Sequence, residues 1–427
     1  MRYRHVQASE AVRRPDRWQP PGATPPRHPD VIVVGSGIVG AACAEALTRR
    51  GVRVTVLDRA PLASGTTAHG EGNLLVSDKP PGPELVLALA SSARWPQLLA
   101  ALDAEERAAG AGGGLAERCE YEAKGGLVVA LDEAGARALT GFAAAQRAAG
   151  VTAHEVGPDD VPAYEPHLTP GVRAAVHYPQ DAQLQPVAAA TALLRAVRRR
   201  GGTLRSGVRA LGVERGADGR VTALRTSAGT LPCGAVVNAC GPWAGRFARD
   251  AGAPLPVRPR RGLVLVTAPL PPGTVRHKVY DADYVGAVGS GAADLRTSAV
   301  VEATRGGTVL IGSSRERAGF EERFRAAVLR ELARKATALF PVLGHVPVIR
   351  AYGGFRPYTP DHLPVIGPDP RLPGLWHATG HEGAGIGLAP ATGELLARLY
   401  TGERPRTDPE PYRVARPGLA EEARCSA

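Results

Sequence analysis

The spacing of hydrophobic residues near the start of the chain predicts a strand–helix–strand unit. Four consecutive β-branched residues, Val31 to Val34, form a short apolar run typical of a buried strand. A glycine-rich turn follows, and small apolar residues then predict a helix over 38–50. A second apolar run over 52–57 ends at Asp58. This order is typical of a βαβ unit with parallel strands.

Further along the chain, helical and strand patterns alternate without an internal repeat. Helical periodicity predicts helices over 85–102, 135–149, 186–200, 324–339 and 390–399. Alternating or continuous apolar runs predict strands over 121–131, 172–178, 208–214, 221–227, 235–238, 375–378 and, broken by turns, 262–312. Two polar, glycine- or proline-rich segments, 64–79 and 352–368, are expected to be loops or turns. The pattern favours a nucleotide-binding domain interleaved with a more antiparallel substrate domain.

Length and composition indicate a globular protein of two domains. The chain has 427 residues, of which 44% are hydrophobic and 22% charged. Its formal net charge is +11, yet Lys and Arg are scattered, aromatic residues make up only 5%, and no nucleic-acid motif is present. We therefore expect no nucleic-acid partner. The positive balance can attract small anionic substrates.

The termini and cysteines indicate a cytoplasmic protein without a metal site. Residues 1–29 are rich in Arg and Pro and are expected to form a mobile extension. Arg13 and Arg14 would suit a twin-arginine signal, but no apolar segment follows them directly. No apolar run approaches the roughly 18 residues of a membrane span. The five cysteines show neither a CxxC pair nor zinc-ligand spacing.

A dinucleotide-binding fingerprint lies between the first strand and the first helix. Gly35 permits a tight turn, Gly37 lets the backbone approach a pyrophosphate, and Gly40 allows close helix–strand packing. The helix N-terminus would then face the phosphates. Asp58, at the end of the second strand, is placed to accept hydrogen bonds from ribose hydroxyls and disfavours NADP. The motif alone leaves NAD and FAD both open.

Five sequence blocks in fixed order resemble one family. The blocks are Ala63–Leu74, Asp181–Pro186, Asn238–Ala244, Gly354–Gly367 and Gly380–Pro390. From about Asp30 to Leu399 the chain thereby resembles the FAD-dependent D-amino-acid-oxidase superfamily, which includes glycine oxidase, sarcosine oxidase and D-amino acid dehydrogenases. The glycine-rich strings at 69–73 and 380–385 are most similar to the dehydrogenase-type members, such as D-hydroxyproline dehydrogenase and hydrogen cyanide synthase subunits.

The resemblance implies FAD as cofactor and a defined set of cofactor-binding residues. In the first half of the chain these are Gly35, Gly37, Ile38, Val39, Gly40, Asp58, Arg59, Ser64, Thr66, Thr67, Gly72, Asn73 and Leu74. In the second half they are Val208, Ala239, Gly241, Trp243, Gly380, His381, Glu382, Gly383, Ala384, Gly385, Ile386 and Gly387. No cysteine stands between Cys240 and Cys425, so the covalent flavin linkage of sarcosine oxidases is not expected.

The implied fold is α/β, with a Rossmann-like FAD-binding domain interleaved with a mixed or antiparallel-sheet substrate domain of α+β type. The FAD-binding domain is expected to be discontinuous, over 30–110, 171–250 and 351–405. The substrate-binding domain is expected over 111–170 and 251–350, followed after 405 by a C-terminal tail, 406–427.

The family role of the Gly354–Gly367 block assigns Arg356 as the anchor of a substrate carboxylate. Tyr284 is expected over the substrate, although a tyrosine that only packs in a strand is an alternative and Tyr280 competes for that position. His69, in the loop next to the presumed flavin ring, is the third candidate catalytic residue. Glu71 in the same loop is expected either to contact the ring and tune the amine or to be structural.

For two further residues, His381 and Glu302, the sequence indicates no catalytic role. His381 is expected to support the flavin loop rather than to carry protons. Glu302 has no role that the sequence assigns.

These residues imply oxidation of a small amino acid or secondary amine of D-amino acid, glycine, sarcosine or proline type. Hydride would pass to flavin N5, and the resulting imine would be hydrolysed. The electron acceptor is oxygen or an unknown partner, and a homo- or hetero-oligomer is possible. Alternatives are the catalytic subunit of a hetero-oligomeric dehydrogenase, a non-catalytic flavin-binding protein, and an NAD-linked dehydrogenase. An intact anchor block disfavours the non-catalytic protein, and the flavin-loop match disfavours NAD.

Overall fold

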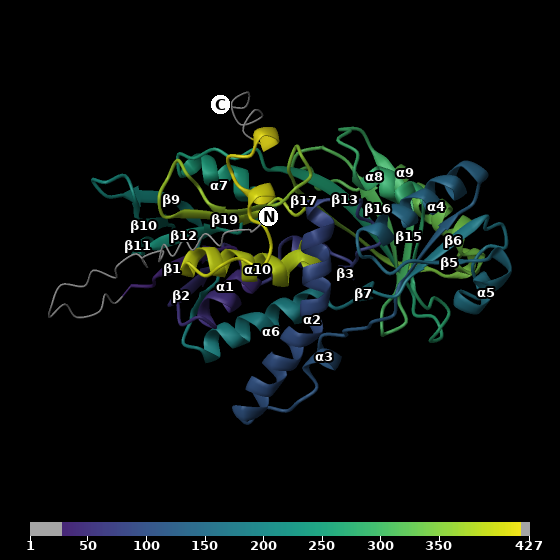
Figure 1. Ribbon diagram of the computed structural model, residues 1–427, viewed down its shortest axis with the longest axis horizontal. Helices are drawn as coiled ribbons and strands as arrows, with labels where there is room; N and C mark the ends of the chain where they lie inside the picture. Colours follow the sequence, from purple (N-terminus) through teal and green to yellow (C-terminus); the bar gives the residue numbers. More distant parts are fainter. Residues whose placement is uncertain (1–27, 420–427) are drawn as a thin grey trace, which may run out of the picture.

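The computed structural model describes residues 28–419 of the chain. Two large β-sheets lie one after the other along the long axis of the molecule, as Figure 1 shows. A two-stranded ribbon of β3 (Asn73–Leu74) and β7 (Ala182–Gln183) lies between them. The predicted extension falls almost wholly outside the described residues, as does the end of the predicted C-terminal tail.

The first sheet has six strands and is parallel apart from one edge strand. Its order is β18 (Val365–Pro368), β19 (Leu375–Thr379), β12 (Ala235–Asn238), β1 (Val31–Val34), β2 (Val54–Leu57) and β8 (Thr203–Arg205). The edge pair, β18 and β19, is antiparallel. Burial on both faces explains the continuous apolar runs, because parallel sheets are covered on both sides.

Different elements pack on the two faces of this sheet. Val31 and Val33 pack in the core formed with the helices, whereas Ile32 and Val34 pack in the core on the opposite face. The helical face carries α1 (Ile38–Thr48), α6 (Pro186–Arg199), α10 (Gly385–Thr401) and α2 (Pro83–Ala108). The opposite face carries α7 (Ala244–Asp250) and a small antiparallel sheet of β9 (Ala210–Arg215), β10 (Val221–Thr226) and β11 (Gly229–Pro232).

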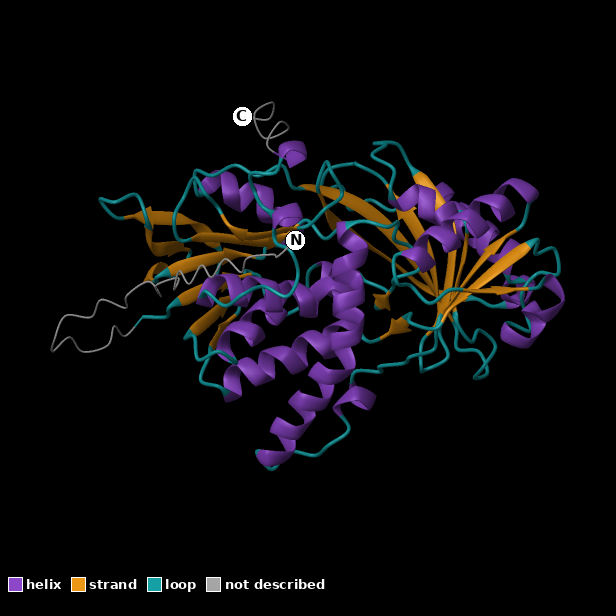
Figure 2. Ribbon diagram, in the orientation of Figure 1, coloured by secondary structure: helices purple, strands orange, loops and turns teal. Residues whose placement is uncertain are grey.

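The second sheet has eight strands, which spread as a fan in Figure 2, and it is mostly antiparallel. Its order is β17 (Val348–Tyr358), β13 (Arg258–Thr267), β16 (Val309–Arg315), β15 (Arg296–Ala303), β14 (Lys278–Asp281), β4 (Gly126–Ala130), β6 (Ala174–Tyr178) and β5 (His154–Val156). Only the central β14–β4 pair is parallel. The remaining helices are α3 (Leu115–Arg118), α4 (Glu133–Ala148), α5 (Val161–Tyr164), α8 (Asp283–Val288) and α9 (Ala326–Leu339).

The predicted fold class, α/β with a mixed-sheet partner, is confirmed, but four local expectations differ. The segment 352–368 was expected to be turns, and most of its first half belongs to the long strand β17, whose pairing with β13 overrides the proline-rich pattern. The loop over 64–79 contains a 3-10 helix, η1 (Thr66–His69), and the short strand β3. The last helix begins at Gly385, with Pro390 inside it. Tyr284 lies on α8 within a region expected to be mostly strand.

The domain boundaries stay a prediction. Both large sheets are assembled from segments that are far apart in the chain and alternate between the sheets. The strand β6, for example, lies within 171–250, which was predicted to belong to the FAD-binding domain, yet it is part of the eight-stranded sheet.

One described helix, α2, is long and apolar enough to cross a membrane by length and composition. On it, Leu85, Leu87, Trp95 and Leu99 are buried in the same core as α1 and α10. The core helix of a globular protein gives this pattern as well. The expected absence of a membrane span therefore stays a prediction.

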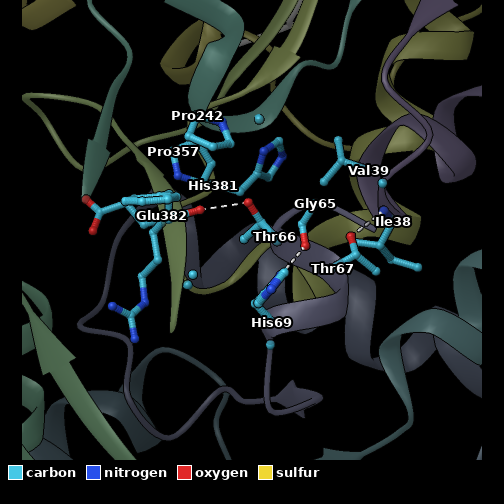
Figure 3. Close-up of a pocket in the computed structure, with 18 of the residues that line it drawn as sticks. Ile38, Val39, Gly65, Thr66, Thr67, His69, Pro242, Pro357, His381 and Glu382 are labelled. Atoms are coloured by element: carbon cyan, nitrogen blue, oxygen red, sulfur yellow. Dashed lines mark hydrogen bonds between the residues drawn. The ribbon is translucent and has the colours of Figure 1, made fainter. Parts of the chain in front are cut away.

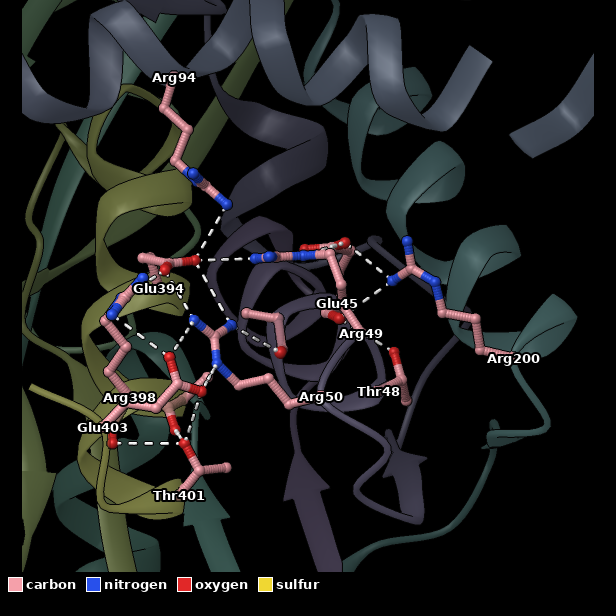
Figure 4. A network of polar contacts seen from close by, with 12 residues as sticks. Glu45, Thr48, Arg49, Arg50, Arg94, Arg200, Glu394, Arg398, Thr401 and Glu403 are labelled. Atoms are coloured by element: carbon pink, nitrogen blue, oxygen red, sulfur yellow. Dashed lines mark hydrogen bonds and ion pairs between the residues drawn. The ribbon is translucent and has the colours of Figure 1, made fainter. Parts of the chain in front are cut away.

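A buried carboxylate joins α2, α10 and the end of α1. Glu394 on α10 accepts hydrogen bonds from Arg50 and Arg398 on one oxygen, at 2.7 and 2.6 Å, and from Arg49 and Arg94 on the other, at 2.8 and 2.9 Å (Figure 4). Its side chain is only 9% exposed. Burial alone would raise the pKa of Glu394, but the guanidiniums outweigh burial and hold this pKa well below its usual range.

We predict that Glu394→Gln lowers the free energy of unfolding by about 3 kcal/mol, because it removes a charge shared by four partly buried guanidiniums and leaves Arg94 without its ion-pair partner. The folded-state pKa is depressed, so the stabilisation is present above the unfolded pKa of about 4.3 and is lost as the pH falls below it. Urea unfolding at pH 7 and pH 4 measures both effects.

The matched control is Glu331→Gln, which removes an exposed carboxylate that pairs only with Arg334 on the same helix. It should leave the unfolding midpoint unchanged. Equal midpoints for the two variants at pH 7 would contradict a structural role for the Glu394 cluster.

Candidate active site

A single large cavity of about 960 Å³ extends from the glycine turn after β1 to the edge of the eight-stranded sheet. Its wall includes the start of α1, the loop with η1, the segment after β12, strands β13 and β17, and the loop that leads into α10. Figure 3 shows Thr66, Thr67 and His69 of η1 on one stretch of wall, with His381 and Glu382 beside them. Segments from both sheets therefore form one site.

The glycine turn leaves no room for side chains at two of its positions. Gly35 has a φ of +110°, and a Cβ there would lie 2.2 Å from the carbonyl oxygen of Ala239 on the neighbouring segment. A Cβ at Gly40 would lie 2.0 Å from the carbonyl oxygen of Gly35. Only glycine permits this close packing of turn, helix and strand.

The N-terminus of α1 opens on the cavity. Ile38 donates its N–H to the Thr67 hydroxyl at 2.9 Å, which fixes the η1 loop against the first turn of the helix. Gly37, the residue before the helix, also faces this hydroxyl, and Val39 lines the cavity. A helix N-terminus of this kind provides N–H groups and a positive dipole end for a phosphate.

Asp58 also stabilises the glycine turn, a role that the sequence did not reveal. One carboxylate oxygen accepts from both the N–H and the hydroxyl of Ser36, at 2.8 and 2.7 Å, inside the glycine turn. The other accepts from the N–H of Ala60 at 3.0 Å. A carboxylate has about four lone-pair sites. Asp58 thus holds the turn in shape and keeps acceptor capacity toward the cavity that it lines.

An aromatic stack covers one side of the cavity. The guanidinium of Arg59 lies 4.0 Å from the ring centre of Trp243, and Phe320 stacks on the same tryptophan at 5.2 Å between ring centres. Phe320 in turn meets Phe355 of β17 edge-on at 5.3 Å. Phe320 lies in a loop, and no pattern in the sequence indicated that it would stack on Trp243.

The loop before α10 is held by two residues that were predicted to bind the cofactor. His381 is buried and shares a hydrogen bond of 3.0 Å with the Thr392 hydroxyl, and burial lowers its pKa to about 3. It is therefore neutral near pH 7, which fits support of the loop rather than proton transfer. The carboxylate of Glu382 accepts from Arg260 at 3.0 Å and lies 2.6 Å from the His362 ring, so both of its oxygens have partners within the protein.

Arg356 presents an uncompensated guanidinium to the cavity. It lies on β17, donates to the Ser314 carbonyl at 2.8 Å, and pairs with no carboxylate of residues 28–419. A Cβ at Gly262 would lie 2.2 Å from its Nη1, so the glycine makes room for the side chain. Burial, and then the nearby Arg315, lower the pKa of Arg356 to about 10, which leaves it charged at neutral pH.

The two tyrosine candidates are separated by the structure. Tyr284 lines the cavity, and the guanidinium of Arg315 lies 4.7 Å from its ring centre. Tyr280 is fully buried behind it and donates its hydroxyl to Ser77 at 2.6 Å. Arg315, which also lines the cavity, is a site residue that sequence reasoning missed.

His69 lies on the wall with its ring edge toward Tyr352, at 6.3 Å between ring centres. Its Nδ1 is 2.8 Å from the Gly65 carbonyl, a bond within η1 (Figure 3). Of all the predicted cofactor-binding and catalytic residues, only Leu74 and Gly380 do not line the cavity. Leu74 packs in the hydrophobic core. Within the described residues no cluster of His, Cys, Asp and Glu could hold a metal ion.

Comparison with known proteins identifies the family. Residues 30–399 match the model of the FAD-dependent oxidoreductase family DAO. Glycine oxidase of Geobacillus kaustophilus is 29% identical over 91% of this chain and 97% of its own. The hydrogen cyanide synthase subunit HcnC of Pseudomonas aeruginosa is 28% identical over 91% and 96%.

The solved structure of Geobacillus kaustophilus glycine oxidase superposes with a TM-score of 0.79 at 27% identity, over 91% of this chain and 99% of that one. The L-proline dehydrogenase of P. horikoshii superposes equally well, with a TM-score of 0.79 at 23% identity, which shows a shared fold. This chain belongs to the DAO family of FAD-dependent oxidoreductases, and its cofactor is FAD.

The residues around the cavity fit FAD. The glycine turn and the α1 N-terminus suit a pyrophosphate, Asp58 suits a ribose, and Val208 lines the wall next to it with its N–H bonded to the Asp58 carbonyl at 2.9 Å. The predicted contacts of individual residues with FAD remain proposals.

We predict that Asp58→Asn lowers the affinity for FAD by about tenfold, because the amide loses the negative charge and has only one acceptor oxygen, so it cannot accept from both Ser36 and Ala60. Fluorescence titration of the FAD-free protein with FAD measures this affinity. Asp218→Asn, in an exposed turn where the side chain accepts only from Arg220 N–H, is the control. An unchanged FAD affinity in Asp58→Asn would show that this carboxylate is not needed at the site.

Proposed function

We propose that this protein oxidises a small amino acid or secondary amine to its imine, which water then hydrolyses. The observation that carries the proposal is Arg356, a half-buried cation on the cavity wall that donates to a main-chain carbonyl and pairs with no carboxylate of residues 28–419. A planar guanidinium binds a carboxylate through two parallel hydrogen bonds, which fix both its position and its rotation. A carboxylate-bearing substrate therefore suits this cavity.

The names of the relatives support an amine as the group that is oxidised. They include glycine oxidase, and the structure of an iminodiacetate oxidase from Chelativorans superposes with a TM-score of 0.75 at 25% identity. Both names denote substrates in which nitrogen lies next to a carbon that carries a carboxylate. We extend this class, and not one particular amine, to the present chain.

The residues of the cavity contribute orientation, shape and exclusion of water. Arg356 would hold the carboxylate, while Tyr284, fixed by the Arg315 guanidinium, would close one side of the substrate. Tyr352 and His69 would close the other. Bound FAD supplies the acceptor for the hydride that leaves the α-carbon. No strong acid or base is required if the amine is neutral when hydride departs.

A second candidate keeps the chemistry but makes this chain the FAD-binding subunit of a larger dehydrogenase. The observation that favours it is the similarity, over nearly the full length of both chains, to a protein named as a subunit of hydrogen cyanide synthase. The electron acceptor would then be a partner subunit instead of oxygen. A cytoplasmic location is part of both proposals.

We predict that Arg356→Lys raises KM for the amine substrate by at least about tenfold while the protein keeps its FAD, because a lysine loses the paired hydrogen bonds. Steady-state kinetics and the FAD-to-protein absorbance ratio measure the two effects. Arg350→Lys, where the guanidinium lies beside Tyr352 at 5.5 Å, is the control. An unchanged KM in Arg356→Lys would remove this residue from substrate binding.

A substrate panel separates the two candidates. The purified protein is expected to be yellow and to lose its flavin absorbance under nitrogen with at least one of glycine, sarcosine, D-proline and other D-amino acids. Oxygen consumption with that amine would indicate an oxidase. Reduction of a dye without oxygen consumption would indicate a dehydrogenase that requires a partner. A colourless protein that does not bind added FAD would contradict both.

A further inference from the structure

Behind the cavity wall lies a group of charged side chains that the proposed reaction leaves unexplained. Lys278 on β14 is 3% exposed, and its Nζ lies 3.3 Å from the Glu302 carboxylate on β15, which is fully buried. The same Nζ lies 3.9 Å from the carboxylate of Glu71, which lines the cavity. Lys124 sits close by but is occupied by the Ala303 carbonyl at 2.6 Å and by Glu122 at 3.7 Å.

This group contains more hydrogen-bond acceptors than donors. Within residues 28–419, four of its buried oxygens have no hydrogen-bond partner: Glu71 Oε1, Asn73 Oδ1, Gln183 Oε1 and Glu302 Oε1. Asn73 and Gln183 face each other across the β3–β7 ribbon, and Asn73 donates to Glu71. Buried acceptors without donors are unfavourable by roughly 1–3 kcal/mol each. Of these four residues Glu71 and Asn73 line the cavity, where a bound ligand can supply a donor.

Lys278 is not that donor. Burial lowers the pKa of Lys278, but Glu302, Glu71 and Tyr284 together outweigh burial and raise it, so the lysine stays protonated. Burial raises the pKa of Glu302, and Lys278 opposes this. Since Nζ lies closer to Glu302 than to Glu71, the lysine is bound mainly to its buried partner. Glu71 keeps an oxygen that Lys278 does not reach within hydrogen-bond distance.

The position of Glu71 is fixed relative to Arg356. Asn73 donates to one carboxylate oxygen at 3.1 Å, and a Cβ at Gly312 would lie 2.3 Å from the other, so the carboxylate rests on the main chain of β16. Two residues further along the same strand, the Ser314 carbonyl accepts from the Arg356 guanidinium. One strand therefore seats a carboxylate and a guanidinium next to each other on the cavity wall. An α-amino acid carries the complementary pair of charges one carbon apart.

We propose that Glu71 binds the positively charged amine of the substrate while Arg356 binds its carboxylate, so that the site selects zwitterions over carboxylates that lack an amine. The ammonium then passes one proton to the Glu71 carboxylate, and the amine is neutral when hydride departs. This inference rests on the proposed function and adds the residue that recognises the nitrogen. Lys278 and Glu302 act as positioning residues: the buried carboxylate retains the lysine, and Glu71 is left free for the substrate. Glu302 thereby gains a role that the sequence did not assign.

Two dead-end ligands of the same shape test the proposal. In 2-aminoisobutyrate an ammonium occupies the place of one methyl group of pivalate, and neither compound has a hydrogen on its α-carbon. The change in absorbance of bound FAD gives the dissociation constant of each. We expect the wild-type protein to bind 2-aminoisobutyrate at least about tenfold more tightly than pivalate, and Glu71→Gln to bind both about equally.

The control variant is Glu322→Gln, which removes the same charge from an exposed residue elsewhere on the cavity wall and should keep the tenfold preference. Glu71→Asp provides a second variant if Glu71→Gln does not fold, and it should lose part of the preference. Unchanged preference in Glu71→Gln or Glu71→Asp, or no preference in the wild-type protein, would overturn the proposal. Loss of pivalate binding in Arg356→Lys would show that Arg356 binds the carboxylate, independently of the role of Glu71.

The variant Glu302→Gln tests whether Glu302 positions Lys278 or has only a structural role. A neutral amide releases Lys278 toward Glu71, so affinity for 2-aminoisobutyrate should fall while affinity for pivalate stays the same. A purely structural role would change both affinities together or neither. Either of those results would remove Glu302 from the proposal. A wild-type protein that binds neither ligand would instead count against the carboxylate site, and thus against the proposed function.

Discussion

A half-buried guanidinium without a carboxylate partner in the described part of the chain, that of Arg356, sets the requirements for the substrate end of the cavity. Taking Arg356 out of water is unfavourable, and the nearby Arg315 adds repulsion, as the lowered pKa of Arg356 records. The side chain is retained because Gly262 leaves space for it and the Ser314 carbonyl accepts one of its hydrogens. The remaining N–H groups are free for a ligand. An anion that enters the cavity relieves both the burial and the repulsion.

Close contacts between main-chain segments hold the cofactor end in a comparable way. Gly35 meets the carbonyl of Ala239, and Gly72 meets that of Leu184 at 2.0 Å from its would-be Cβ. On the helical side, a Cβ at Gly393 would lie 2.4 Å from the Ala42 carbonyl, which places α10 directly on α1. Sequence blocks that lie hundreds of residues apart converge because glycine lets their backbones touch.

Sequence reasoning succeeded where the chemistry is local and failed where it depends on pairing across the chain. The glycine turn, the first helix and Asp58 follow from short-range rules, and the nucleotide site followed from them. The strand around Arg356 was expected to be turns, since only its ten-residue partner β13 stabilises it. Arg315 lines the cavity and Phe320 stacks on its Trp243, and both come from segments without any motif. Glu302 could not be interpreted until its distance to Lys278 was known.

The geometry of β17 links the two ends of the site. The Phe355 carbonyl accepts from the Thr66 hydroxyl of the η1 loop at 2.7 Å, and the next residue along the strand is Arg356. Successive side chains of a strand point to opposite faces, so Phe355 packs on the aromatic stack while Arg356 reaches β16. The position of the carboxylate anchor relative to the cofactor loop is thus set by the main chain. Differences in substrate among proteins of this fold can then arise from side chains such as Glu71, which stand on a frame that does not need to move.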